Sequence, residues 1–207
     1  MVSTDDGDGL RIHAGDRAAA VDRVVVTVPA TAAARILADL DGATAAPLGE
    51  LAYNSLVLVS MAADLDADGF GYQVRRDEPL ETLGVTWNDS LFDREGVYTA
   101  FLGGMHAPGV VDRSDAEVGA VACEEFETVT GSAAEVRAVR TLPRALPAYD
   151  GTWDALEDVQ LPDDVDLATN YTARLGVPSR LRQARTLAEQ LAATDDTPTR
   201  HERTPEQ

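Results

Sequence analysis

The 207-residue chain has no lysine, so all 17 of its basic residues are arginines. Acidic residues number 36, and the formal net charge is -19 at pH 7. A phosphate-binding loop of the G-x-x-x-x-G-K type requires a lysine, and binding to nucleic acid requires a basic stripe. The sequence has neither feature, so it excludes this loop and predicts that nucleic acid is not a partner.

The acidic excess has two interpretations. Dense surface carboxylates suit a halophilic protein in a high-salt cytoplasm, because salt screens their mutual repulsion. The alternative is GC-rich codon bias, which by itself does not favour Asp and Glu, and we therefore favour the high-salt interpretation. The paired carboxylates, such as Asp163-Asp164, are then expected to be solvated surface.

Cysteine and histidine are also scarce. The single cysteine, Cys123, excludes an internal disulfide and a cysteine metal cluster, and its apolar neighbours favour a packing role. The three histidines are isolated, so no zinc-hydrolase spacing exists and no metal site is predicted. His106 follows a double glycine and is expected to be an exposed loop residue, with a catalytic role as the less favoured alternative.

Two further signals are missing. No G-x-G-x-x-G occurs, and Gly69-Phe70-Gly71 has Val74 where the third glycine belongs, so a turn or bulge in a sheet is expected there. No apolar run is long enough for a transmembrane segment, and the acidic N-terminus does not resemble a signal peptide. These features predict a cytoplasmic protein.

Hydrophobic patterns predict mixed helices and strands. The run Val21–Val28 is expected to be a strand buried on both faces, followed after Pro29 by a helix over 32–40 with Thr31 as its N-cap. An antiparallel sheet with one following helix is expected in the middle of the chain. Its predicted strands cover 51–62, 70–74, 81–87, 97–102 and 136–141, and its helix runs from Ser114 to about Thr130.

The last structured segment predicts a strand, a polar turn and a helix. The strand covers about 161–170, after a loop over 145–151 and a short helix over 152–159, and the closing helix covers 177–193. Pro178 fits the first helical turn, where its missing N–H costs nothing. The open N–H groups of such a helix start favour an anion or an electron-rich ring oxygen.

Five segments, in this order, resemble the C-terminal half of the protoporphyrinogen oxidase and flavin-containing amine oxidase flavoenzymes. They are Asp22–Ala30 with its strand and proline, Gly69–Gly71 with Leu83-Gly84 and 88–92, Thr99–Gly104, Pro143–Tyr149, and Asn170-Tyr171 with Gly176–Pro178. The match covers roughly residues 20 to 192.

The resemblance implies an α/β fold and FAD as the cofactor. Residues 10–50 and 142–193 would form a partial FAD-binding lobe, residues 51–141 a substrate-domain-like antiparallel sheet with its helix, and residues 194–207 a disordered tail. By carry-over, the flavin contacts would be Asn170, Tyr171, Gly176, Val177 and Pro178. No residue of the chain is identified as a catalytic acid or base.

Several positions depart from the family pattern. Glycines are usual where this chain has Thr169, Arg174 and Ala184, and an arginine at 174 could block the flavin. The dinucleotide-binding half is missing, so a separate FAD-binding half or a homo-oligomer is the expected partner.

The resemblance leads to a first hypothesis, with two alternatives. In it, the chain is a C-terminal fragment or subunit of a protoporphyrinogen oxidase-like oxidoreductase that oxidises a porphyrinogen or amine-like substrate, in haem biosynthesis if the closer match holds. The first alternative is a non-catalytic α/β binding module that no longer binds flavin. An unrelated small α/β enzyme ranks last.

Overall fold

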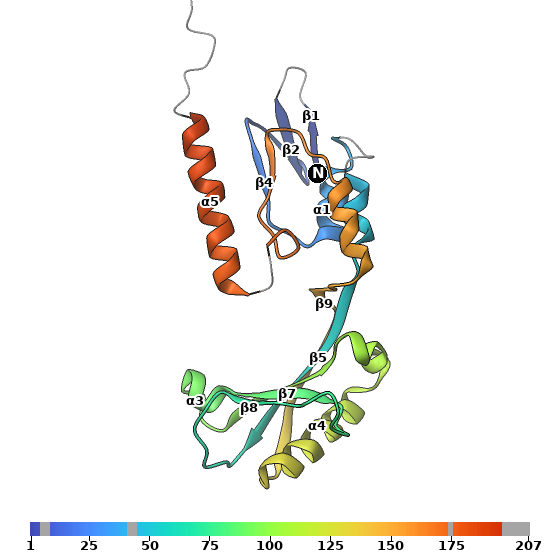
Figure 1. Cartoon of the computed structure of the whole chain (residues 1–207), viewed down its shortest axis with the longest axis vertical. Helices are drawn as coiled ribbons and strands as arrows, with labels where there is room; N and C mark the ends of the chain where they lie inside the picture. Colours follow the sequence, from blue (N-terminus) through green and yellow to red (C-terminus); the bar gives the residue numbers. More distant parts are fainter. Residues whose placement is uncertain (5–8, 41–44, 174–175, 196–207) are drawn as a thin grey trace, which may run out of the picture. The chain divides into compact units, whose positions relative to one another are not determined.

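The computed structural model describes residues 1–4, 9–40, 45–173 and 176–195. The chain divides into two compact units, one made of residues 1–51 and 149–207 and the other of residues 52–148 (Figure 1). The first unit thus combines both ends of the chain, and the second consists of its middle. No helix in the described ranges is long and apolar enough to cross a bilayer.

The first unit contains two small sheets. Strands β1 (Val2–Thr4), β2 (Leu10–Ala14) and β3 (Arg17–Val21) form an antiparallel sheet. Strand β4 (Val24–Val26) pairs in parallel with β10 (Val165–Leu167), with Val24 opposite Val165 and Val26 opposite Leu167. The expected meeting of the two distant segments is therefore confirmed.

The helices of the first unit are α1 (Ala30–Leu37), the 3₁₀ helices η1 (Ala46–Glu50) and η4 (Gly151–Asp158), and α5 (Val177–Asp195). The predictions for the strand over 21–28 and for the helix after Pro29 were wrong in detail. The run 21–28 is two strands interrupted at residues 22–23, and Val25 is 41% exposed between the buried Val24 and Val26, so β4 is buried on one face and not on both. Helix α1 begins at Ala30, directly after Pro29 and without a side-chain cap, because the fixed φ of proline already suits a helix entry.

The second unit is an antiparallel sheet in the order β6-β7-β8-β5-β9. Its strands are β5 (Tyr53–Ala63), β6 (Gly71–Gln73), β7 (Thr82–Trp87), β8 (Val97–Gly103) and β9 (Ala134–Pro147). Its helices are α3 (Asn88–Phe92), the 3₁₀ helices η2 (Gly104–His106) and η3 (Pro108–Asp112), and α4 (Asp115–Thr130). The predicted antiparallel sheet and helix are thus confirmed.

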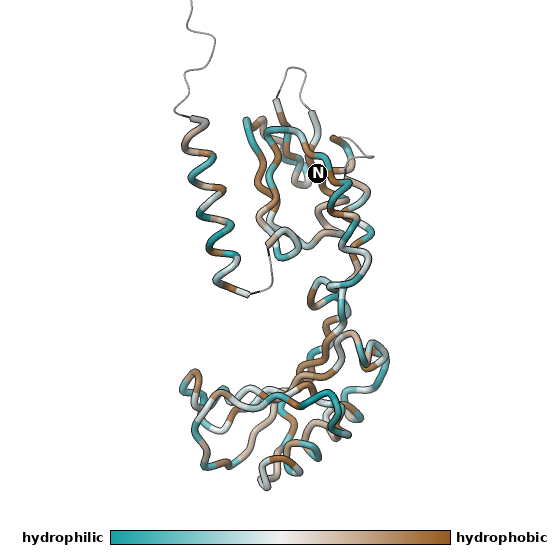
Figure 2. Tube along the Cα trace, in the orientation of Figure 1, coloured by the Kyte–Doolittle hydropathy of each residue, from teal (hydrophilic) through white to brown (hydrophobic). Residues whose placement is uncertain are grey.

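Alternation along the strands produces the core of this unit. Val57, Val59 and Met61 of β5 are buried together with Phe126 of α4 and their neighbours on β7 and β8. Figure 2 shows the same concentration of hydrophobic residues in the strands of the sheet. Helix α4 therefore covers one face of the sheet, and the residues between the buried ones point to the other face.

Strand β9 extends further than its sequence indicates. The expected loop over 145–151 begins only after Pro147, which still pairs with Tyr53 of β5. An irregular register between Leu142 and Leu146 accommodates Pro143, because a bulge removes the need for a ladder hydrogen bond at that residue. Pairing with β5 thus keeps the end of β9 extended, although the prolines of β9 suggested a loop there.

Candidate functional site

The first candidate region is the closing segment of the first unit. Arg23, just before β4, donates hydrogen bonds to the Asp166 carboxylate at 2.9 Å and to the Asp163 carbonyl at 2.8 Å. At the two ends of the β4–β10 pair, the Val24 N–H donates to the Asp164 carbonyl at 2.9 Å and the Ala168 N–H donates to the Val26 carbonyl at 3.0 Å. These contacts fix where the polar turn after β10 begins.

The polar turn over 168–173 is held by its own threonines. The hydroxyls of Thr169 and Thr172 lie 3.0 Å apart, and the Thr169 N–H donates to Thr172 Oγ1 at 3.2 Å. Tyr171 is only 1% exposed, so its side chain belongs to the interior, whereas Asn170 is half-buried. Thr169, one of the positions where glycine was expected, is buried and helps to build the turn.

Helix α5 begins at Val177, as predicted, and its first turn is open. Gly176 has φ +115°, a backbone angle that favours glycine, and among the described residues a Cβ there would come within 4 Å only of Pro178 Cδ, at 4.0 Å. Val177 is 71% exposed, and Pro178 is exposed as well. The positive end of a long helix dipole is therefore accessible at these three residues. Arg174, predicted as a possible obstruction, lies outside the described residues.

The second candidate region is the face of the sheet opposite α4, within the second unit. A pocket of about 550 Å³ is present there. Its walls are mostly apolar and include Leu56, Phe70, Leu83, Phe101 and Leu146, with Asn54 and Thr86 among its few polar side chains. Phe70 is 80% exposed at its rim. A concave, mainly apolar surface with a few polar groups is typical of a site for a small organic ligand.

Two of the residues that line this pocket are glycines on neighbouring strands. Gly71 has φ +120°, and a Cβ at that position would lie 1.9 Å from the Val85 carbonyl oxygen. Gly84 has φ +152°, and a Cβ there would lie 2.4 Å from the Tyr72 carbonyl oxygen. Only glycine allows β6 and β7 to approach this closely, which explains the Gly69-Phe70-Gly71 pattern that predicted a sheet turn or bulge.

A smaller pocket of about 420 Å³ adjoins the first, and Leu83 lines both. It lies between the β6–β7 connection and the segment after β8, and it contains Arg76 and His106. The Arg76 guanidinium is 3.3 Å from His106 Nδ1 and also contacts Nε2. His106 is exposed, as expected, but its proximity to Arg76, 30 residues away, had no signal in the sequence.

The ionisable groups with raised pKa values lie on the α4 side of the sheet. Burial, and then the charge of Glu125, raise the pKa of Tyr72 to about 12. Burial also raises the pKa of Tyr98 and of the Cys123 thiol, which is partly buried as a packing residue. These shifts keep the groups protonated, so they do not supply a base to the open face. No cluster of three metal-ligating side chains occurs within the described ranges.

Comparisons with known proteins find one family model and several similar proteins. The family model described as flavin containing amine oxidoreductase matches residues 2–191. The chain is similar to the chloroplastic protoporphyrinogen oxidase 1 of Spinacia oleracea, with 26% identity over 155 residues, which are 65% of this chain and 28% of the spinach protein.

Solved structures share the fold. A crystal structure from Exiguobacterium sp. 255-15, described as a protoporphyrinogen oxidase, aligns over 93% of this chain and 46% of its own, with 23% identity and a TM-score of 0.72. Putrescine oxidase bound to putrescine aligns over 92% of this chain and 47% of its own, with 17% identity and a TM-score of 0.64. The chain thus spans less than half the length of these relatives.

Proposed function

Because the chain belongs to the flavin containing amine oxidoreductase family, we propose that it forms the C-terminal part of an FAD-dependent, protoporphyrinogen oxidase-like enzyme. In this proposal the first unit supplies one wall of the flavin site, and the open face of the second unit receives the substrate. The observation that carries the proposal is the in-register parallel pairing of β4 with β10, which brings both ends of the chain into one unit ahead of the exposed start of α5.

We propose that the flavin ring lies against the backbone of the closing segment, because the Tyr171 side chain is itself buried. Gly176, Val177 and Pro178 present an open helix N-terminus, and Asn170 and Tyr171 lie in the preceding turn. When bound, FAD would supply the redox chemistry by accepting hydride equivalents from the substrate. The backbone N–H groups at the start of α5 would favour an electron-rich ring oxygen, because the dipole there is positive.

The β4–β10 pair supports the need for a second, dinucleotide-binding part. Parallel sheets are normally buried and many-stranded, yet in the described part of the chain β10 pairs with β4 alone. On its other edge the Leu167 carbonyl accepts a hydrogen bond from the Gln183 side chain at 3.4 Å, in place of a strand. We infer that a strand of an FAD-binding half adds to this edge. A second copy of this chain is the alternative partner.

The substrate of such an enzyme would lie against the apolar pocket on the open face. A porphyrinogen or an amine with a large apolar body suits its Leu and Phe walls. Oxidation of a porphyrinogen would place the enzyme in haem biosynthesis. Among the described residues, the walls of the apolar pocket carry no carboxylate or histidine side chain, so their contribution is to position the substrate and to exclude water.

Purification of the tagged chain from its own host tests the proposal. We expect the visible absorbance of flavin to co-purify with it, together with a second polypeptide that carries the dinucleotide-binding motif. Mass measurement of the complex separates this partner from a second copy of the chain. A colourless protein that binds no added FAD, with or without co-purified partners, would favour the alternative, a binding module without flavin.

Two glycine variants add specificity to this test. Gly176→Ala strains a residue at φ +115°, so it should weaken FAD binding about tenfold or more. Gly151→Ala is the control in the same unit, because a Cβ there meets no other atom within 4 Å and its φ is not positive. Equal FAD affinity of the two variants would contradict the placement of the flavin at the start of α5.

A further inference from the structure

The small pocket beside the apolar one carries cationic charge in a strongly acidic chain. Three arginines stand in or beside it, and two of them have their own carboxylate. Arg75 pairs with Asp77 through two hydrogen bonds of 2.6 and 3.1 Å, and Arg113 pairs with Glu81 at 2.6 Å. No ion pair joins Arg76 to a carboxylate within the described part of the chain. Of these three arginines, Arg76 is thus the one without an ion pair, since Glu81, which also lines the pocket, pairs with Arg113.

The partner that Arg76 does have cannot neutralise it. His106 contacts the guanidinium through its ring, so it acts as an acceptor and offers no negative charge. A guanidinium has five donors, and a carboxylate can take two of them side by side. Acidic residues outnumber basic ones by 36 to 17, so carboxylates that could pair with an arginine are abundant in this chain. An arginine that contacts a histidine in a pocket instead is therefore the kind of group that binds an anionic ligand.

The adjoining apolar pocket indicates what is attached to the anion. Leu83 lines both pockets and is 41% exposed, and its Cδ1 lies 3.7 Å from where a Cβ of Gly104 would be. A ligand that extends across Leu83 would therefore have one end at Arg76 and the other against Leu56 and Phe101. Such a ligand has a charged end and an apolar body.

We propose that Arg76 and His106 form a subsite for a carboxylate group whose apolar body lies across Leu83 in the larger pocket. That the substrate is an apolar acid rests on the proposed function. That a carboxylate binds at Arg76 and His106 does not, because all of these residues belong to the second unit and flavin takes no part in the contacts.

Titration of the full chain with small acids, without flavin, tests the subsite. The probes are acetate, hexanoate and the neutral hexanamide at constant ionic strength, and the signals are the NMR shifts of the His106 ring and the Leu83 methyl groups. We expect hexanoate to move both signals and to bind more tightly than either of the others, because each buried methylene strengthens binding by about fourfold. Equal affinity for hexanoate and hexanamide would overturn the proposal.

Two variants distinguish the contribution of Arg76 to binding from an effect of the overall charge. Arg76→Gln should weaken hexanoate binding about tenfold or more and leave hexanamide unaffected. Arg137→Gln is the matched control, because it removes the same charge from an exposed position on β9. Equal losses in the two variants would show a general charge effect and contradict the subsite.

Inorganic phosphate is the last arm of the test. Phosphate could satisfy Arg76 but has no body to lie across Leu83, so weaker binding than that of hexanoate is expected. Phosphate binding as tight as that of hexanoate would overturn the proposal that the ligand is an apolar acid. Failure of the flavin experiment with a positive result here would refute only the proposed function.

Discussion

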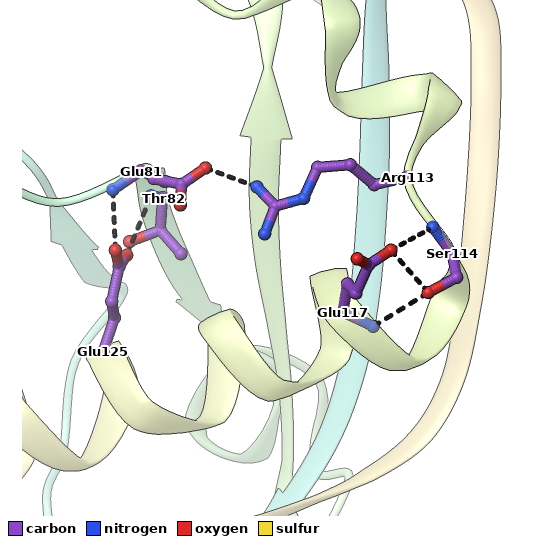
Figure 3. A network of polar contacts seen from close by, with 6 residues as sticks. All are labelled: Glu81, Thr82, Arg113, Ser114, Glu117 and Glu125. Atoms are coloured by element: carbon purple, nitrogen blue, oxygen red, sulfur yellow. Dashed lines mark hydrogen bonds and ion pairs between the residues drawn. The ribbon is translucent and has the colours of Figure 1, made fainter.

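The Glu125 carboxylate on α4 accepts a hydrogen bond from the backbone N–H of Thr82 at 2.9 Å (Figure 3). Its other oxygen accepts one from the N–H of Glu81 at 2.7 Å, and the Glu81 side chain in turn pairs with Arg113. Glu125 is buried, although most glutamates of this chain are expected at the surface. It therefore connects helix α4 to the start of β7, which lines the small pocket.

Removal of this connection should destabilise the second unit. In Glu125→Ala two backbone N–H groups lose their acceptor, and a buried unsatisfied donor costs about 1–3 kcal/mol. We expect a fall of this size in the free energy of unfolding, measured by urea denaturation followed by circular dichroism. Glu124→Ala, at the exposed neighbouring position, should change it little, and equal effects of the two variants would contradict the role of Glu125.

The N-terminus of α4 offers a second prediction. Ser114 and Glu117 form a capping box, in which Ser114 Oγ accepts from the Glu117 N–H and the Glu117 carboxylate accepts from the Ser114 N–H (Figure 3). Ser114→Ala should lower the free energy of unfolding by about 1 kcal/mol, whereas Ser114→Asp should retain most of it because aspartate also caps helices. If Ser114→Asp is no better than Ser114→Ala in urea denaturation, the cap does not stabilise α4.

The close approach of β6 and β7 makes Gly71 irreplaceable. A Cβ at this position would overlap the Val85 carbonyl oxygen, and φ is +120°. Gly71→Ala should therefore lower the free energy of unfolding by about 2 kcal/mol or more and open the edge of the apolar pocket. Gly109→Ala is the control, since a Cβ there meets no other atom within 4 Å. A Gly71→Ala variant as stable as Gly109→Ala would contradict the β6–β7 geometry.

Stability should fall in alkaline solution. The pKa of Tyr72 is raised from 10.0 to about 12, chiefly by burial, so between these values the unfolded tyrosine loses its proton while the folded one keeps it. The stabilising contribution is complete below pH 10 and is lost as the pH approaches 12. In Tyr72→Phe the stability lost between pH 10 and pH 12 should be smaller by roughly 1 kcal/mol, after allowance for solvent screening. Denaturation midpoints at several pH values measure this, and Tyr149→Phe, at an exposed position, should follow the unmodified chain.

How well the sequence predicts this structure depends on how far apart in the chain the interacting residues lie. Local signals located the core of the fold: Ser114 marked the start of α4, an apolar and β-branched run predicted β5, and alternation predicted β6 and β7. Pairing overrode local signals in β9, whose prolines suggested a loop but whose neighbour β5 keeps it extended as far as Pro147.

The candidate sites divide in the same way. The start of α5 at Val177 was predicted from a contiguous pattern and is confirmed, whereas the flavin contacts of Gly176, Val177 and Pro178 come from the family resemblance and stay a prediction. The juxtaposition of Arg76 with His106 and the bonding of Glu125 to the backbone of β7 join residues 30 or more positions apart. A single sequence has no periodicity that reports such contacts, so only the structure could reveal them.

Hydrogen exchange at the open edge of β10 tests the central claim most directly. The N–H of Leu167 points away from β4, because the neighbouring residues on the strand bond to that side. We predict that this amide exchanges rapidly in the isolated chain and becomes strongly protected in the flavin-containing complex purified from the host, where a partner strand adds to the edge. Unchanged exchange of Leu167 in that complex would contradict the account.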